Sequence, residues 1–182
     1  MAIHAAVPEQ PNSARLVGSA RNGDPEALGT LYDAFGADLF RLAYRLTGTR
    51  EDAEDVVHDV FVGLPEALVR YEERGQFDAW LRRVTARVAL MRLRGQARRR
   101  ETGFEDVAEL PARTNATSEQ VELQTALDAL PHALRSVLVL KEMEGYSHAE
   151  IADLLGISAA TSRIRLFRAI RQVRRKLEEE DR

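Results

Sequence analysis

The stretch GYSHAEIADLLGIS, residues 145–158, predicts a helix-turn-helix. Ser147 and Glu150 have the S-x-x-E spacing of a capping box, in which each side chain accepts a hydrogen bond from a backbone N–H group at the helix start. Gly156 is suited to the left-handed conformation that ends such a helix, and Ser158 can cap the next one. Two helices joined by a tight turn of this kind are typical of DNA-binding proteins, in which the second helix enters the major groove.

The second predicted helix has an apolar side and a basic side. Its inward stripe repeats at steps of three and four residues and consists of Ala159, Ser162, Leu166, Ile170, Val173 and Leu177. No acidic residue occurs between Ser158 and Leu177. An arginine-rich face can be merely solvated, but behind a capped helix and a glycine turn we expect DNA contact. The first turn would meet base edges, and the later arginines would meet phosphates.

Composition restricts the class of protein. A chain of 182 residues suits one domain or two small ones, and 45% hydrophobic residues are enough for folded cores. The net charge of −3 means that DNA binding requires local clusters of arginine. The absence of cysteine excludes disulfides, thiolate zinc sites and cysteine nucleophiles. No apolar run approaches the length of a membrane span, and no signal-peptide core is evident, so we expect a cytoplasmic protein without membrane insertion.

Two predicted helices in the first half of the chain carry opposite charges. The helix that Thr49 can cap begins with acidic residues, which suit the positive end of the helix dipole. Pro65 should kink or break this helix, because proline lacks the N–H donor and crowds the preceding turn. The helix after Gly75 is basic on one side, and its expected apolar stripe is Phe77, Trp80, Leu81, Val84, Val88 and Met91.

The whole pattern predicts an all-α chain of two small helical domains joined by a flexible linker. No alternation typical of β-strands is sustained, and periodicity disappears in an acidic stretch rich in serine, threonine, glycine and proline. The expected divisions are a disordered N-terminal tail at 1–12, a first domain at 13–100, a linker at 101–120 and a second domain at 121–182.

Catalytic chemistry is not indicated. The histidines are scattered without metal-ligand spacing, and no glycine-rich phosphate loop or nucleophile motif occurs. Paired acids such as Glu54 and Asp55 fall at a helix start rather than in an evident cleft. We therefore predict no catalytic residue, no metal site, no cofactor and no enzyme activity.

Two blocks of the sequence resemble the extracytoplasmic-function sigma factors, group IV of the sigma-70 family, which keep only regions 2 and 4. The first block reads DAEDVVHDVF at 52–61 and GQFDAWL at 75–81, followed by the basic helix. The second includes Leu130, Pro131, Arg135, Glu144, most of the helix-turn-helix stretch, Thr161, Arg165, Leu166, Arg168 and Ala169. A helix-turn-helix alone is only moderately specific, whereas both blocks in this order are highly specific.

The resemblance implies a promoter-recognition subunit of RNA polymerase that serves a stress- or signal-responsive regulon. The implied partners are core RNA polymerase, through the coiled coil of its largest subunit and its flap region, promoter DNA, and an anti-sigma factor. The residues implied for docking on the coiled coil are Asp52, Asp55 and Asp59. Those implied for binding and opening the −10 element are Tyr71, Trp80, Arg83 and Arg87. Those implied for reading the −35 element are Ser158, Thr161, Arg163, Ile164, Arg165 and Arg168.

Five positions depart from the family pattern. Pro65 replaces a bulky helix former, which predicts a bend at the end of the docking helix. Arg87 and Met91 replace Asn and Asp, which bears on −10 preference and strand opening. Ser162 replaces an inward apolar residue, and a buried, poorly paired hydroxyl there would cost about 1–3 kcal/mol. Ile164 replaces a small polar residue and could contact a thymine methyl group.

Two other functions are compatible with parts of the sequence. A stand-alone helix-turn-helix regulator would bind an operator unaided, but it leaves the acidic helix and the Phe77–Trp80 block unexplained. A degenerate sigma homologue would act as an adaptor that binds polymerase or an anti-sigma factor without opening promoters. Transcription that depends on a promoter separates these functions.

Overall fold

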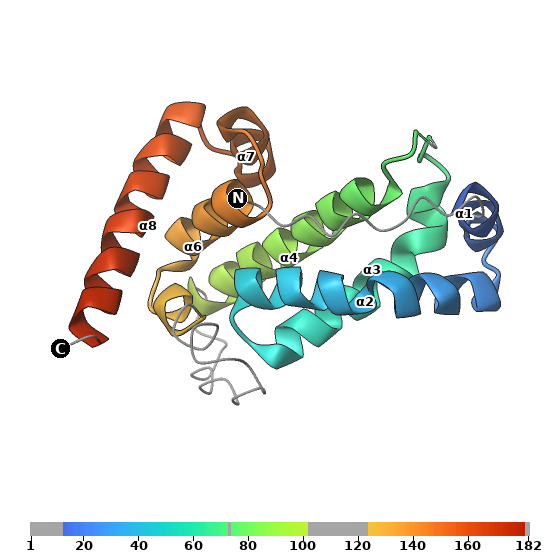
Figure 1. The fold of residues 1–182 in the computed structure, drawn as a ribbon, viewed down its shortest axis with the longest axis horizontal. Helices are drawn as coiled ribbons and strands as arrows, with labels where there is room; N and C mark the ends of the chain where they lie inside the picture. Colours follow the sequence, from blue (N-terminus) through green and yellow to red (C-terminus); the bar gives the residue numbers. More distant parts are fainter. Residues whose placement is uncertain (1–12, 73, 102–123, 181–182) are drawn as a thin grey trace.

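The computed structural model describes residues 13–72, 74–101 and 124–180, and all regular structure within them is helical (Figure 1). The first lobe consists of α1 (Ser13–Arg21), α2 (Pro25–Thr47), α3 (Arg50–Leu68) and α4 (Phe77–Glu101). The second lobe consists of a helical turn at 124–128, α6 (His132–Leu138), the π-helical η1 (Val139–Met143), α7 (His148–Leu155) and α8 (Ala159–Glu180). The predicted all-α class is confirmed. The expected tail and almost all of the expected linker lie outside the described residues.

Local sequence determines both ends of α2. Glu26 N donates to Asp24 Oδ1 at 3.0 Å, and Pro25 occupies the first helical position, where the missing N–H has no intrahelical partner to lose. Gly48 ends the helix with φ 86°, and its N–H donates to Tyr44 O at 2.8 Å. This left-handed conformation favours glycine, because a Cβ atom would crowd the neighbouring carbonyl.

The helix α3 bears on two expectations from the sequence. Thr49 caps it as expected, since Thr49 Oγ1 accepts a hydrogen bond from Asp52 N at 3.2 Å. A break at Pro65 is not found, because α3 continues as one helix as far as Leu68, while the alternative of a kink stays a prediction. Leu64 and Leu68 are fully buried on the two sides of the proline, so core packing offsets the lost backbone hydrogen bond.

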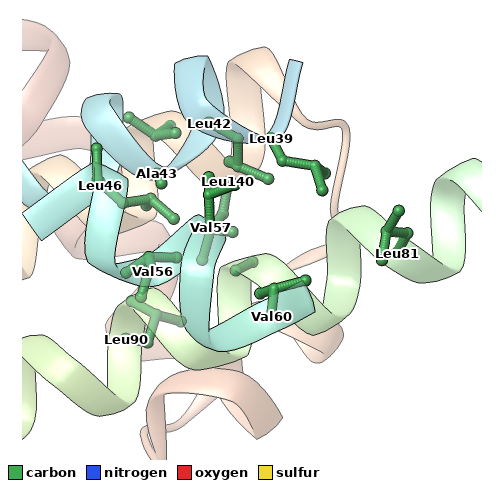
Figure 2. Packing of buried hydrophobic residues seen from close by; sticks show 14 of the residues in the cluster. Leu39, Leu42, Ala43, Leu46, Val56, Val57, Val60, Leu81, Leu90 and Leu140 are labelled. Carbon is green, nitrogen blue, oxygen red and sulfur yellow. The ribbon is translucent and has the colours of Figure 1, made fainter. Parts of the chain in front are cut away.

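An apolar core joins α2, α3 and α4 (Figure 2). Burying each large aliphatic side chain contributes about 1.5–3 kcal/mol relative to leaving it in water, so the core dominates the stability of this lobe. Its fully buried members include Leu31, Leu39, Leu42, Leu46, Val56, Val60, Leu64, Leu68 and Leu81.

The inner face of α4 differs from the predicted stripe. Met91 is 62% exposed, so its expected place in the core is wrong. Small residues lie inside instead, and Thr85 satisfies its buried hydroxyl by donating to Leu81 O at 2.9 Å. Alanine allows neighbouring helices to approach closely, and a search for large apolar residues overlooks it. Among the side chains of α4 that the structure describes, the buried ones are Phe77, Leu81, Thr85, Ala86, Ala89, Leu90 and Leu93.

The two lobes pack against each other through shared apolar burial. Val137, Val139 and Leu140 of the second lobe belong to the same buried cluster as the core of α2, α3 and α4. Figure 2 labels Leu140 among the α2 and α3 side chains of this cluster. Contacts also run from α6 to α2 and from α7 to α4. The described residues therefore form one closed body.

Arg135 of α6 is buried at the junction of the lobes, with 4% exposure. Its Nε donates to Leu127 O and its Nη2 donates to Asp128 O, both at 2.9 Å, and its Nη1 lies 3.4 Å from Asp128 Oδ1. Burial lowers the pKa of Arg135, and the Asp128 carboxylate opposes that shift. The same guanidinium lies directly against Gly48, where a Cβ atom would overlap Nη1.

We predict that Gly48→Ala destabilises the chain more than Gly23→Ala does. Both glycines have positive φ, 86° and 77°, so each substitution costs about 1–2 kcal/mol in backbone strain. Only Gly48→Ala also displaces Arg135, which cannot move without breaking its buried hydrogen bonds, whereas nothing lies within 4 Å of a Cβ at Gly23. Urea unfolding of the two variants measures the difference. Equal losses would show that the junction tolerates the displacement.

Candidate nucleic-acid interface

The helix-turn-helix has the capping geometry that its sequence predicts. Glu150 N donates to Ser147 Oγ at 3.2 Å, and Ser147 N donates to Glu150 Oε2 at 2.9 Å. Gly156 ends α7 with φ 65° and ψ 38°. Ser158 Oγ accepts from Thr161 N at 3.0 Å and so caps α8. The hydrogen bonds with Ser147 lower the pKa of Glu150, which favours its ionised form and the closed capping box.

The outward side of α8 presents the residues predicted to read DNA. Ile164 is 53% exposed, and the hydroxyl groups of Ser158 and Thr161 lie 2.8 Å apart at the start of the helix. Both hydroxyls already have a protein partner, so they can offer only their remaining capacity to a base edge. The exposed members of the predicted set are Ser158, Arg163, Ile164 and Arg168, and the half-buried members are Thr161 and Arg165.

Phe167 is a surface residue of α8 that the sequence argument missed. Its side chain is 62% exposed, and the guanidinium carbon of Arg171 lies 5.8 Å from its ring centroid. Its spacing of three residues from Ile164 and four from Arg171 was the signal that could have found it. An exposed aromatic ring beside an arginine is a surface on which a base or a protein partner can stack.

Ser162 is buried but has a partner. Its exposure is 0%, and its Oγ lies 2.9 Å from Nδ1 of His148. The expected cost of a poorly paired hydroxyl is therefore wrong, because α7 supplies the partner. The pKa of His148 is lowered by partial desolvation and by the nearby cations Lys141 and Arg163. The neutral imidazole is favoured as a result, and it can accept a hydrogen bond from the serine.

Tyr71 lies inside an aromatic cluster rather than at the surface. It is 7% exposed, and its ring centroid is 4.7 Å from that of Trp80 and 5.6 Å from that of Phe77. The backbone carbonyl of Tyr71 also accepts a hydrogen bond from Arg21 Nη2 at 2.8 Å. Ring packing holds the Tyr71 side chain inside, so little of its surface is open to a ligand in this structure, and its role at the −10 element stays a prediction. Trp80 is only half-buried.

Arg83 and Arg87 of α4 have different surroundings, although both were expected to bind the −10 element. Arg83 Nη2 lies 3.0 Å from Glu150 Oε1, and its guanidinium lies 6.0 Å from the ring centroid of Tyr146. The second lobe thus engages one of the arginines assigned to DNA by the sequence. Arg87, one turn further along α4, is exposed.

Asp52 faces α4 rather than open solvent. Its side chain is 14% exposed, and its Oδ1 accepts hydrogen bonds from Arg92 Nε at 2.6 Å and Gln96 Nε2 at 2.7 Å. Thr49 Oγ1 donates to Oδ2 at 2.8 Å. Burial by itself raises the pKa of Asp52, but the hydrogen bonds from Arg92, Thr49 and Gln96 together lower it. The sequence missed this staple between α3 and α4, because its partners are 40 and 44 residues away.

The rest of the predicted acidic flank is more accessible. Asp55 also pairs with Arg92, through Nη2, and its side chain remains 50% exposed. Asp59 is exposed. The three acids therefore do not form one uniformly solvated flank, since Asp52 belongs to the packing between helices and Asp59 lies at the surface.

Other kinds of site have little support in the residues that the structure describes. Among them, no group of three or more histidine, aspartate or glutamate side chains could hold a metal ion. None of the helices in the described ranges is long and apolar enough to cross a membrane. The basic side of α8 and the surface around Trp80 and Arg87 are the features that call for a functional explanation.

Comparisons with known proteins relate both lobes to transcription factors. Residues 31–99 match the family described as Sigma-70 region 2, and residues 120–173 match Sigma-70, region 4. The chain is 37% identical over 145 residues to the ECF RNA polymerase sigma factor SigE of Mycolicibacterium smegmatis, covering 75% of this chain and 56% of that protein. It is 30% identical over 158 residues to SigM of Mycobacterium tuberculosis, covering 87% and 81%. The solved structure of CnrH in complex with the cytosolic domain of CnrY has a TM-score of 0.57 and 28% identity, covering 91% and 96%.

We predict that Asp52→Asn makes the free energy of unfolding depend less steeply on pH in acid. The folded-state pKa of Asp52 lies below its ordinary value, so its contribution is present above about pH 4 and is lost as the pH falls through the lowered pKa. The variant should be less stable than the parent at neutral pH, and its unfolding free energy should fall less steeply in acid. Urea unfolding over a pH series measures both effects, with the exposed Asp153→Asn as the control. If the free energies of unfolding of parent and Asp52→Asn depended on pH in the same way, the stabilising contact of Asp52 with α4 would be contradicted.

Proposed function

Because the chain belongs to the extracytoplasmic-function branch of the sigma-70 family, we propose that it binds core RNA polymerase and directs it to specific promoters. The observation that carries this proposal is the pairing, on one chain and in family order, of a region 2 match and a region 4 match. The second match includes a fully capped helix-turn-helix whose second helix is basic on its outward side. A regulator that binds an operator by itself would need only the helix-turn-helix, so it does not account for the region 2 match.

In this proposal the start of α8 reads the −35 element. Arg165 and Arg168 supply guanidinium groups, which bind guanine edges or phosphates through paired donors. Ile164 is exposed and apolar, so it would favour a thymine methyl group at the base step it faces. Thr161, with its hydroxyl close to that of Ser158, and the exposed Arg163 complete the contact set.

The first lobe would capture the −10 element around Trp80 and Arg87. The half-buried indole and the exposed arginine, seven residues apart on α4, would provide stacking and charge for an unpaired strand. Tyr71 acts in this proposal as a positioning residue, since its buried ring packs against Trp80 and fixes the direction of the indole. Arg83 would join the surface once it is released from Glu150.

Docking on polymerase would use the acidic side of α3. Asp59 and the half-exposed Asp55 are the accessible carboxylates, and Asp52 keeps α3 and α4 in register beneath them through Arg92. The coiled coil of the largest polymerase subunit is the proposed partner on this side, and the flap region is the proposed partner of the second lobe. The polymerase supplies the chemistry of RNA synthesis, and the chain itself is a non-catalytic subunit.

We also propose a regulatory protein partner of the anti-sigma class. The support is that a relative of the same fold, CnrH, has been solved in complex with the cytosolic domain of another protein, CnrY. A partner that keeps the lobes closed would hide Arg83 and the surface around it.

The test is single-round transcription with purified core RNA polymerase over DNA from upstream of the chain's own gene. We predict specific transcripts that require the chain and that disappear in the Arg165→Ala, Arg168→Ala double variant. Losing contacts to bases costs about 1–3 kcal/mol each, which corresponds to a loss of about tenfold or more in promoter use. Arg174→Ala, an exposed position further along α8, is the matched control and should retain promoter choice.

Two outcomes would favour other functions. Binding to core polymerase without any transcript would indicate the adaptor. Stable binding to a DNA site without any binding to polymerase would indicate a stand-alone regulator. Equal loss of transcripts in the double variant and in Arg174→Ala would mean that α8 contributes charge but does not read bases.

A further inference from the structure

A buried carboxylate of the second lobe lies against an arginine of the first lobe. The side chain of Glu144, the residue after η1, is 2% exposed, and that of Arg82 on α4 is 26% exposed. Arg82 Nε donates to Glu144 Oε2 at 3.0 Å, and Arg82 Nη2 donates to the same oxygen. The other oxygen, Oε1, is buried and accepts no hydrogen bond from any residue that the structure describes. One carboxylate oxygen of Glu144 is therefore hydrogen-bonded to Arg82, and the other has no hydrogen-bond partner among the described residues.

A second arginine of the first lobe lies at the same site. Arg83 borders the same cavity of about 110 Å³ as Arg82 and Glu144. We call Arg82 and Arg83 the arginine notch. It belongs entirely to the first lobe, whereas the anion inside it belongs to the second.

Elementary electrostatics explains why the notch needs an anion. Neighbouring guanidinium groups repel one another, and partial burial strengthens that repulsion because less water screens it. A guanidinium presents a planar fork of donors that matches two oxygens of a carboxylate or a phosphate. Glu144 meets Arg82 with only one of its two oxygens, while Arg83 pairs with Glu150 of the same lobe. A buried ion pair with an unpaired oxygen adds little net stability to the closed state.

We propose that the arginine notch binds a phosphate of the DNA backbone, and that Glu144 occupies it as an internal substitute while the lobes are closed. Closure of the lobes and DNA binding by the first lobe then compete for the same cationic site. The inference rests on the proposed function in one respect, namely that DNA is the source of the phosphate. It adds Glu144, to which the sequence alone gave no role in DNA binding, and it pairs that residue with Arg82 of the basic helix.

The position of the notch fits a DNA strand. Ala79 lines the cavity beside Arg82 and Arg83, and it precedes Trp80 in the first turns of α4. A strand with bases stacked on Trp80 would have its backbone near this end of α4. Glu144, Gly145, Tyr146 and Glu150 line the cavity from the second lobe and would leave with it, so the open site offers the guanidinium donors of Arg82 and Arg83. Such a lining suits a phosphate better than a base.

The test compares Glu144→Gln with the Glu144→Gln, Arg82→Ala double variant in the full chain. A fluorescent single-stranded oligonucleotide is titrated at several salt concentrations, and the affinity of the chain without polymerase is read by anisotropy. We expect Glu144→Gln to bind several-fold more tightly than the parent. Its plot of log affinity against log salt should be steeper by about 0.7 for each additional phosphate that the notch binds. Removing Arg82 as well should abolish both effects, and Glu144→Gln with Arg15→Ala, at an exposed position of α1, should keep them.

Lobe separation is measured in the same variants, so that opening and phosphate binding are distinguished. The chain has no cysteine, and exposed Ala34 and Asp153 can be changed to cysteine and spin-labelled, one in each lobe. We expect both Glu144 variants to shift the distances towards longer values, because each removes the charge that closes the notch. Glu144→Ala is a second opening variant that lacks the amide oxygen. If both variants open but bind DNA with the same salt dependence, the notch is only a latch and the proposal is overturned.

A separate experiment distinguishes a phosphate of the DNA backbone from a free phosphate ion. An oligonucleotide with a neutral methylphosphonate backbone should not bind the variant more tightly than the parent, and inorganic phosphate at the same concentration should compete poorly. Full competition by inorganic phosphate would overturn the assignment to DNA in favour of a free anion. Transcription by the parent chain is measured in parallel. If the parent chain supports transcription but the Glu144 variants show no change in salt dependence, only the phosphate-binding role of the arginine notch is rejected. If the parent chain supports no transcription, the proposed function is rejected.

Discussion

Burial of the Arg135 guanidinium is the constraint on which the junction between the lobes depends. A charge removed from water needs partners, and it finds them in the carbonyls of Leu127 and Asp128 and in the Asp128 carboxylate. These partners hold the turn at 124–128 against α6. The guanidinium also lies at the carboxyl end of α2, against Gly48, where the helix dipole favours a cation. One arginine thereby links the fold of the second lobe to its place on the first.

Arginines of α4 form ion pairs with α3 and with two glutamates of the second lobe. Arg92 pairs with the acidic side of α3, and Arg82 and Arg83 pair with glutamates of the second lobe. Arg87 remains exposed. The closed chain thus offers less free positive charge around Trp80 than the sequence of α4 implies. With a net charge of −3 for the whole chain, this pairing leaves the closed arrangement with weak general attraction to nucleic acid.

The predictions from sequence succeed where the interaction is short-range. The caps at Asp24, Thr49 and Ser147 and the left-handed glycine at 156 involve partners two to four residues away, so a linear pattern contains them. The predictions fail where a distant partner decides. Pro65 stays helical because the core holds the leucines beside it, and Ser162 is satisfied by His148 on another helix. Phe77 and Trp80 follow Tyr71 within nine residues, but the linear pattern does not show that the chain folds their rings against it.

The sequence by itself determined the helical class, most helix ends, the helix-turn-helix and the resemblance to a sigma factor. Hydrophobic periodicity and capping act within a few residues and are legible in the chain. Only the tertiary structure decided which charges are free, which aromatic ring is buried and whether the lobes are closed. Coulombic and packing energies depend on distance in space. Arg82 and Glu144, 62 residues apart in the chain, are joined by a hydrogen bond of 3.0 Å that no linear pattern contains.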